Sequence, residues 1–446
     1  MIQKVILFLY FSSFLVSIFG FPIKIRDLLS PTVDPFYAPP TGFESAKVGS
    51  ILKQRTLPPN ALALLSAFPQ NIEQVHQFLY RTTDGLGNPT ATVTTLMVPY
   101  NADPTKLVSY QVAEDSPYIE CAPSYTFQKD SGVAGVNTQV EILLIDTLLS
   151  RGWYVNVPDY EGPGSYFTVG AMAGHGVLDS VRAVLSSTNT SKLHADAKVQ
   201  MWGYSGGALA TGWAVQLQPS YAPELSFIGA ALGGTPVNIN ATLNAVDGSP
   251  FAGLVASGII GLSQQYKELN DYVNQMIKPE KKQMFEESKK KCLGELILKY
   301  AFQRFSDFVS RPDYLNDPIA TKVINDNIMG QTDTPKVPLF MYHSKNDQIV
   351  PFAPAKTLVN NWCGKGATIE FVQDELSDHV ILAITGAANA IRFIINRFSG
   401  KDIAMNCSTR TTLTSILDPG ALDIFGKVIW DALNALLLQP IGPHNF

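Results

Sequence analysis

The chain has 446 residues, a hydrophobic content of 46% and a formal net charge of −5. This length and composition suffice for a large buried core in one or two domains. Nucleic acids and anionic membranes attract basic surfaces, so the slight negative charge argues against both as partners.

The N-terminus has the pattern of a secretory signal peptide, which we place at residues 1–20. Lys4 precedes an apolar stretch over residues 5–18, and Gly20 follows it. The stretch is shorter than the roughly 20 residues of a membrane span, so a signal anchor is the weaker alternative. We therefore expect residues 21–446 to be secreted into the extracellular space, without a stable membrane span.

Sequons and cysteines agree with secretion. Asn-x-Ser/Thr sequons make Asn189, Asn240 and Asn406 candidate glycosylation sites. The four cysteines are Cys121, Cys292, Cys363 and Cys407. An even number in a secreted chain predicts two disulfides, with three possible pairings. The cysteines lack metal-ligand spacing, so no metal site is expected.

Strand-like and helical segments alternate along the first half of the chain. The β-favouring segments are residues 91–98, 107–112, 153–158, 199–202 and 227–232, and the helical ones are residues 141–149, 178–185 and 208–217. Such alternation predicts an open, mostly parallel α/β sheet flanked by helices.

The alternation stops at about residues 235–335, where the sequence becomes helical. It resumes with strands over 337–343 and 368–372 and helices over 354–362 and 380–398. A helical insertion of this length between two strands of one sheet would lie over the carboxyl ends of the strands. We expect it to form a cap over an active site.

The pentapeptide at residues 203–207 reads Gly-Tyr-Ser-Gly-Gly. This G-x-S-x-G pattern follows a predicted strand and precedes a predicted helix, which is the setting of a nucleophile elbow. In that turn the serine hydroxyl stands above the edge of the sheet. We predict that Ser205 is a catalytic nucleophile.

A serine hydroxyl needs a base, and in this architecture the acid and the histidine follow the serine in that order. The chain has six histidines, of which His343, His379 and His444 follow Ser205. His343 precedes the best acid candidate and His444 lies in the C-terminal tail. His379 lies in a loop between a strand and a helix, so we predict that it is the base.

The acid is predicted at Asp347, in the loop after the strand that ends at residue 343. A carboxylate there can reach the histidine of the next loop. An ordinary Asx turn is the alternative role for this residue. Asp374, Glu375 and Asp378 are rivals, but they share a loop with the histidine, which makes a cross-loop hydrogen bond awkward.

An oxyanion hole requires two backbone N–H donors. The residue after the nucleophile, Gly206, supplies one. The second is expected in the loop after the strand at 107–112, where many lipases carry an H-G-G-G run that this chain lacks. Asp115 occupies the expected position, although it could also be a turn residue.

Several motifs together resemble the secreted fungal, Candida-type triacylglycerol lipases. The matching segments are residues 110–116, 121–124, 152–163, 203–207, 347–351 and 377–379. The resemblance spans nearly the whole mature chain. It implies an α/β-hydrolase fold with a lid, no cofactor, and a triacylglycerol or other lipid ester at a lipid–water interface as substrate.

Matched position by position, the resemblance implies a Ser205–Asp347–His379 triad with Asp115 and Gly206 at the oxyanion hole. It also implies the disulfides Cys121–Cys292 and Cys363–Cys407. A secreted short-chain carboxylesterase, a serine peptidase and a non-catalytic lipid carrier remain as alternatives. The apolar stretch at residues 251–262 favours acyl chains over peptides. The sequence makes no prediction about oligomeric state.

Overall fold

The computed structural model describes residues 28–58, 61–62, 71–129, 131–132, 138, 141–402, 406–421 and 423–424. The predicted signal peptide at residues 1–20 and His444 lie outside the described residues.

The described chain contains a ten-stranded sheet in the order β1-β2-β3-β5-β4-β6-β7-β8-β9-β10. The strands are β1 (Ile51–Leu57), β2 (Gln74–Thr83), β3 (Pro89–Val98), β4 (Asp103–Gln111), β5 (Trp153–Pro158), β6 (Lys198–Tyr204), β7 (Phe227–Gly233), β8 (Leu339–Ser344), β9 (Ile369–Asp374) and β10 (Ser408–Thr412). From β5 to β10 every neighbouring pair is parallel. The prediction of a mostly parallel α/β sheet is therefore confirmed.

The first three strands form an antiparallel edge that the sequence reading only partly anticipated. The sequence pattern predicted β3 but neither β1 nor β2. A tight turn joins β2 to β3. In that turn the Asp84 carboxylate accepts hydrogen bonds from the N–H groups of Leu86 and Asn88, and Gly87 adopts a φ of 86°. Asp and Gly are favoured in such turns because Asp binds nearby N–H groups and Gly allows a positive φ.

Helices cover both faces of the sheet, which is why strands such as β5 are buried along their whole length. One face packs against α5 (Gly170–Ser186), α7 (Gly206–Tyr221) and α14 (Phe352–Gly364). The other face packs against α4 (Ile142–Leu149), α15 (His379–Thr385) and α16 (Ala387–Phe398). The shorter elements are η1 (Phe43–Ser45), η3 (Ile119–Cys121), α2 (Pro123–Thr126), α6 (Thr188–Ser191) and η6 (Ser415–Leu417).

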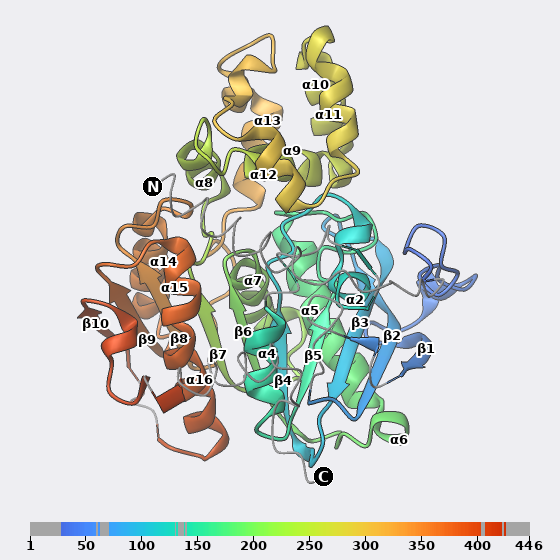
Figure 1. Cartoon of the computed structure of the whole chain (residues 1–446), viewed down its shortest axis with the longest axis vertical. Helices are drawn as coiled ribbons and strands as arrows, with labels where there is room; N and C mark the ends of the chain where they lie inside the picture. The colour runs from blue at the N-terminus through green and yellow to red at the C-terminus, as the bar shows by residue number, and fades with distance from the viewer. Residues whose placement is uncertain are drawn as a thin grey trace, which may run out of the picture.

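Between β7 and β8 the chain forms a layer of helices above the sheet (Figure 1). These are α8 (Ile239–Val246), α9 (Gly253–Gln265), α10 (Lys267–Met276), α11 (Pro279–Ser288), α12 (Leu293–Tyr300) and α13 (Pro318–Asp326), with the 3-10 turns η4 (Phe305–Asp307) and η5 (Tyr314–Asn316). We call residues 239–326 the insertion. Its apolar side chains form one cluster that also contains Ile349 and Val350 of the core.

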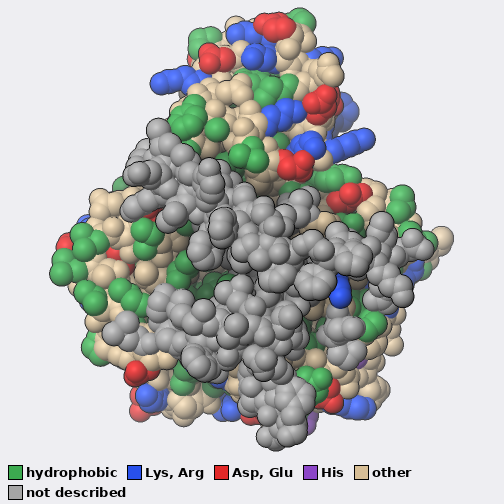
Figure 2. Space-filling model, viewed as in Figure 1, with side chains coloured by type: hydrophobic (Ala, Val, Ile, Leu, Met, Phe, Trp, Pro, Cys, Tyr) green, Lys and Arg blue, Asp and Glu red, His purple; other side chains and the backbone are tan. Residues whose placement is uncertain are grey.

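Charged side chains of both signs lie on the outer part of the insertion (Figure 2). Among the described residues, five of its lysines form ion pairs, namely Lys267–Asp271, Lys289–Glu286, Lys291–Glu295, Lys299–Glu287 and Lys322–Asp326. This arrangement is that of a solvated surface, with the apolar side of the same helices turned inward.

Within the described residues, His379–Phe398 is the one helical stretch with the length and composition of a membrane span, with a mean hydropathy of 1.4. The structure divides it at Gly386 into α15 and α16, where the sequence predicted one helix. A Cβ at Gly386 would lie 2.6 Å from the Tyr342 ring, so the chain approaches the sheet closely there. Over half of the stretch is buried inside the protein, as in a core helix.

Candidate active site

Ser205 lies in the turn between β6 and α7 with φ 53° and ψ −122°. This backbone conformation is strained for a non-glycine residue and is typical of functional turns. The glycines on either side leave no room for side chains. A Cβ at Gly203 would lie 2.2 Å from the Gly207 carbonyl oxygen, and one at Gly207 would lie 1.9 Å from the Gln111 carbonyl oxygen. The local sequence thus imposes the turn that presents the serine.

Ser205, His379 and Asp347 form a continuous hydrogen-bonded chain. His379 Nε2 is 2.9 Å from Ser205 Oγ, and His379 Nδ1 is 2.7 Å from Asp347 Oδ2. Because a carboxylate only accepts hydrogen bonds, Nδ1 carries the proton and Nε2 is free to accept from the serine hydroxyl. The structure therefore brings together all three residues that the sequence selected.

The carboxylate of Asp347 is held in its ionised form despite being buried. Burial acts to raise its pKa, but the nearby His379 and the hydrogen bond to it, with weaker contributions from His343 and the Val350 N–H, bring the pKa below the usual value. Its other oxygen, Oδ1, accepts from the N–H groups of Ile349 and Val350. A charged, fixed acceptor of this kind orients the imidazole.

Backbone contacts fix the position of His379. Its N–H donates to Gln348 Oε1 at 2.9 Å, and its carbonyl accepts from the Tyr204 hydroxyl at 2.5 Å. Tyr204, the last residue of β6, directly precedes Ser205, so the same segment also holds the predicted base His379. This role of Tyr204 could not be predicted from local sequence, because the contact spans 175 positions.

The rival acids have structural roles. Asp378 caps α15 by accepting from the Ile381 N–H, and Asp374 accepts from the N–H groups of Leu376 and Ser377. Glu375 is paired with Lys345 at 3.0 Å.

His343, which the sequence did not favour as the base, lies beside Asp347. Its Nε2 is 3.0 Å from the Val350 carbonyl oxygen and 3.4 Å from Asp347 Oδ2. Burial lowers its pKa, so the ring is neutral at physiological pH. His343 thus packs against Asp347 and does not reach the serine side of the site.

Asp115 and Gly206, the predicted oxyanion donors, are in direct contact. Asp115 lies in the loop after β4 with a left-handed φ of 51°. Its Oδ1 is 1.7 Å from the position that a Cβ of Gly206 would take, so only glycine fits at residue 206. Burial raises the pKa of the Asp115 carboxyl to about 7, against the lowering effect of His379.

Further buried acids surround this loop. Burial and neighbouring carboxylates raise the pKa values of Glu114 and Glu161 well above their usual range. Burial also raises the pKa of Asp159 to about 7, although Ser124 and Arg55 act in the opposite direction. These groups therefore take up protons at a higher pH than exposed carboxyls do.

A small cavity of about 40 Å³ adjoins the serine. Its lining from the core is Asp115, Phe167, Thr168, Ser205, Gly206, Leu209, Pro236, Ile349 and Val350, and its lining from the insertion is Ile239, Thr242, Leu243 and Leu254. The insertion thus supplies a mostly apolar wall of the cavity beside Ser205. Among the described residues no group of His, Cys, Asp and Glu side chains could hold a metal ion.

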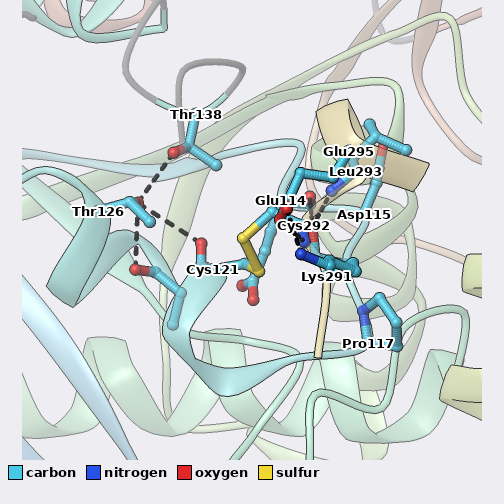
Figure 3. Close-up of a disulfide and its surroundings, with 12 residues drawn as sticks. Glu114, Asp115, Pro117, Cys121, Thr126, Thr138, Lys291, Cys292, Leu293 and Glu295 are labelled. Atoms are coloured by element: carbon cyan, nitrogen blue, oxygen red, sulfur yellow. Dashed lines mark hydrogen bonds and ion pairs between the residues drawn. A yellow bond between two sulfur atoms is a disulfide. The ribbon is translucent and has the colours of Figure 1, made fainter. Parts of the chain in front are cut away.

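The structure contains the two disulfides that the resemblance implied. Cys121 and Cys292 join η3 to the start of α12, and their Cα atoms are 5.5 Å apart (Figure 3). Cys363 and Cys407 join the end of α14 to the segment before β10. The first pair links the core to the insertion close to Asp115.

A mostly parallel sheet with a hydrogen-bonded serine, histidine and aspartate at the carboxyl ends of its strands defines a serine hydrolase of the α/β-hydrolase fold. Residues 127–406 match the model of the secretory lipase family. The chain belongs to this family. It is a triacylglycerol lipase, a carboxylic ester hydrolase that releases fatty acids.

Curated relatives are similar over almost the whole chain. Lipase A of Arthroderma benhamiae is 38% identical over 436 residues, which cover 96% of this chain and 92% of that protein. Lipase 4 of Candida albicans is 42% identical over 427 residues, covering 93% and 91%. The X-ray structure of Candida antarctica lipase A in its closed state superposes with a TM-score of 0.80 at 30% identity, covering 94% of this chain and 100% of that chain.

A more distant neighbour shares the fold alone. The rice cell wall degrading esterase LipA from Xanthomonas oryzae has a TM-score of 0.61 at 16% identity and covers 79% of this chain.

Proposed function

We propose that Ser205, His379 and Asp347 catalyse ester hydrolysis through an acyl-enzyme. The observation that carries this proposal is the hydrogen-bonded chain from Ser205 Oγ through both nitrogens of His379 to Asp347. Ser205 Oγ attacks the ester carbonyl while Nε2 takes its proton. Asp347 holds the imidazole tautomer and stabilises the imidazolium that forms.

The N–H groups of Asp115 and Gly206 stabilise the tetrahedral oxyanion. One such donor contributes about 3–4 kcal/mol to catalysis in enzymes of this type. His379 then gives its proton to the leaving glycerol oxygen, the C–O bond breaks and the acyl group stays on Ser205. A water molecule, deprotonated by His379, attacks the acyl-serine and releases the fatty acid, which restores the hydroxyl.

We propose that the insertion acts as a lid over this site. The cavity of about 40 Å³ is too small for a long acyl chain, and four of its lining residues belong to α8 and α9. In this proposal, a lipid ester reaches Ser205 when these helices move. Such a movement would expose their apolar lining to a lipid–water interface.

We further propose that residues 1–20 direct export and that the sequons carry glycans. Asn189, Asn240 and Asn406 are all exposed, so each is accessible to a transferase. N-terminal sequencing of protein recovered from the medium should begin near residue 21, and treatment with an endoglycosidase should lower its mass.

A panel of nitrophenyl esters from acetyl to palmitoyl tests the proposed chemistry, with wild type and Ser205→Ala compared. We expect turnover to be highest for long acyl chains and to be lost in Ser205→Ala. Turnover that is highest for the acetyl ester would instead indicate a short-chain esterase. Peptide cleavage without lipolysis would favour a peptidase, and undiminished ester turnover in Ser205→Ala would refute the triad.

A further inference from the structure

The loop after β4 is held by contacts from outside the core sheet. Asp115 has a φ of 51°, in the left-handed region that non-glycine residues adopt uncommonly. Two buried serine hydroxyls bind the peptide groups on either side of Asp115. Both connect this loop to the insertion.

The first hydroxyl belongs to Ser116, whose side chain is fully buried. Its Oγ donates to the Glu114 carbonyl oxygen at 2.7 Å and accepts from the Leu293 N–H at 3.0 Å. The Glu114 carbonyl and the Asp115 N–H are opposite ends of one planar peptide group. A hydrogen bond at the carbonyl therefore fixes the direction of the N–H and polarises it toward a stronger donor.

The second hydroxyl belongs to Ser257 of α9. Its Oγ donates to the Asp115 carbonyl oxygen at 2.6 Å, and its side chain is also fully buried. This bond fixes the peptide that follows Asp115, whereas Ser116 fixes the peptide that carries the Asp115 N–H. The two contacts together hold the backbone on both sides of the residue.

The Cys121–Cys292 disulfide holds the Leu293 N–H, which is the donor to the Ser116 hydroxyl, in place. Leu293 is the first residue of α12, and the preceding Cys292 is bonded to Cys121 of η3. The Cys292 N–H donates to Glu295 Oε2 at 3.3 Å, which caps the same helix start. The Leu293 N–H thus stands at a fixed helix end, beside the loop that it contacts.

We propose that Ser116 is a positioning residue of the oxyanion hole, through which the insertion holds the Asp115 N–H. Two hydrogen bonds in series connect the Leu293 N–H, the Ser116 hydroxyl and the peptide group between residues 114 and 115. This inference rests on the proposed role of the Asp115 N–H in stabilising the oxyanion. Through this hydrogen-bonded path, the start of α12 controls the competence of the catalytic site.

Kinetics of Ser116→Ala test the proposal, with Ser116→Thr as the variant that keeps a hydroxyl. We expect Ser116→Ala to lower kcat for a long-chain nitrophenyl ester by roughly 10- to 100-fold, since small displacements of catalytic groups have effects of that order. KM should change less than about twofold, because the Asp115 N–H acts on the transition state. Ser116→Thr should recover a large part of kcat.

A tetrahedral analogue separates positioning from general damage to the site. The affinity of Ser116→Ala for an alkyl boronic acid, which forms an adduct with Ser205, should fall by about the same factor as kcat. Its affinity for the product fatty acid should not change. The matched control is Ser263→Ala, a buried serine of α9 whose hydroxyl lacks a hydrogen-bond partner among the described residues.

A second variant acts from the side of the insertion, in case Ser116→Ala does not fold. Leu293 occupies the first helical position, where proline is favoured, and Cys292 before it has φ −81° and ψ 163°, which proline permits. Leu293→Pro removes the N–H donor, and Leu293→Ala gives the baseline for the lost side chain. We expect kcat of Leu293→Pro to be several-fold below that of Leu293→Ala.

The proposal is overturned if folded Ser116→Ala keeps kcat within twofold of wild type. It is also overturned if Leu293→Pro and Leu293→Ala have equal kcat, or if boronic acid and fatty acid affinities fall together. Failure of the proposed function has a different signature, which is retained turnover in Ser205→Ala.

Discussion

The Asp115 carboxyl lies where a side chain at Gly206 would begin, with Oδ1 1.7 Å from the Cβ position of residue 206. The two residues that we propose as oxyanion donors are therefore packed together as well as sharing a function. A change at one must displace the other. This mutual dependence can be tested directly.

Gly206→Ala should force the Asp115 side chain out of its place and lower kcat by about 100-fold or more, as loss of one oxyanion donor does. Asp115→Gly in the Gly206→Ala background should recover part of the activity, because glycine removes the clash and tolerates the φ of 51°. The matched control is Gly364→Ala, where a Cβ would meet no atom within 4 Å. Equal kcat in the single and double variants would contradict the account.

Asp347→Asn should keep the fold but lower kcat by about 10⁴-fold, since the amide cannot hold the required imidazole tautomer. Its remaining oxygen can still accept from the N–H groups of Ile349 and Val350, as Oδ1 does in the wild type. His379→Ala should be similarly inactive. His194→Ala, at an exposed histidine, serves as control. Steady-state kinetics and thermal melts check the prediction, and a fully active Asp347→Asn would assign the acid to another residue.

The stability of the protein should fall as the pH rises from 6.5 to 9. Burial raises the pKa of Asp115 and Asp159 to about 7 and that of Glu141 to about 8. In this window the unfolded chain has already released these protons, whereas the folded protein still holds part of them. The folded state therefore binds more protons, and its stability decreases with pH until the folded-state pKa values are passed.

Protonation of the buried histidines makes stability rise with pH, but only at a lower pH than this window. Burial lowers the pKa of His76, His175 and His343 below 6.5, so both states hold these rings neutral above that value. Calorimetry should show a Tm several degrees lower at pH 9 than at pH 6.5. Asp159→Asn should reduce that difference. A Tm that rises across this window would contradict the raised carboxyl pKa values.

Leu254→Trp should narrow the cavity beside Ser205 and shift the enzyme toward short acyl chains. Leu254 lines this cavity from α9 and is half-buried. We expect palmitoyl ester turnover to fall by about tenfold or more while acetyl ester turnover changes little. Leu298→Trp is the matched control, because Leu298 belongs to the insertion but is 64% exposed. An unchanged ratio of palmitoyl to acetyl turnover would show that acyl chains bind elsewhere.

The parallel sheet and the candidate catalytic residues could be predicted because their signals are local or follow chain order. Ser205 lies between a strand and a helix within a few residues, and Asp347 and His379 each follow a strand. The glycines at 203 and 207 are required by backbone contacts within the same turn or with the adjacent β4. Such features can be recognised from the sequence because they depend on residues that are close together in it or on their order.

Contacts between segments that are far apart in the sequence could not be predicted in this way, because no local sequence pattern marks them. The Ser116–Leu293 hydrogen bond spans 177 positions, and the Tyr204–His379 contact spans 175. The antiparallel pairing of β1 with β2 depends on cross-strand partners, and their sequences lacked a clear alternation. The break between α15 and α16 reflects the approach of Gly386 to Tyr342, which sequence periodicity does not reveal.

The most direct test of the account is covalent trapping of the nucleophile with a long-chain nitrophenyl phosphonate. Wild-type protein should lose activity and gain the mass of one phosphonyl group, and peptide mapping should place that group on the peptide containing Ser205. Ser205→Ala should gain no mass under the same conditions. Modification of Ser205→Ala, or labelling of another residue in the wild type, would contradict the assignment of Ser205 as the nucleophile.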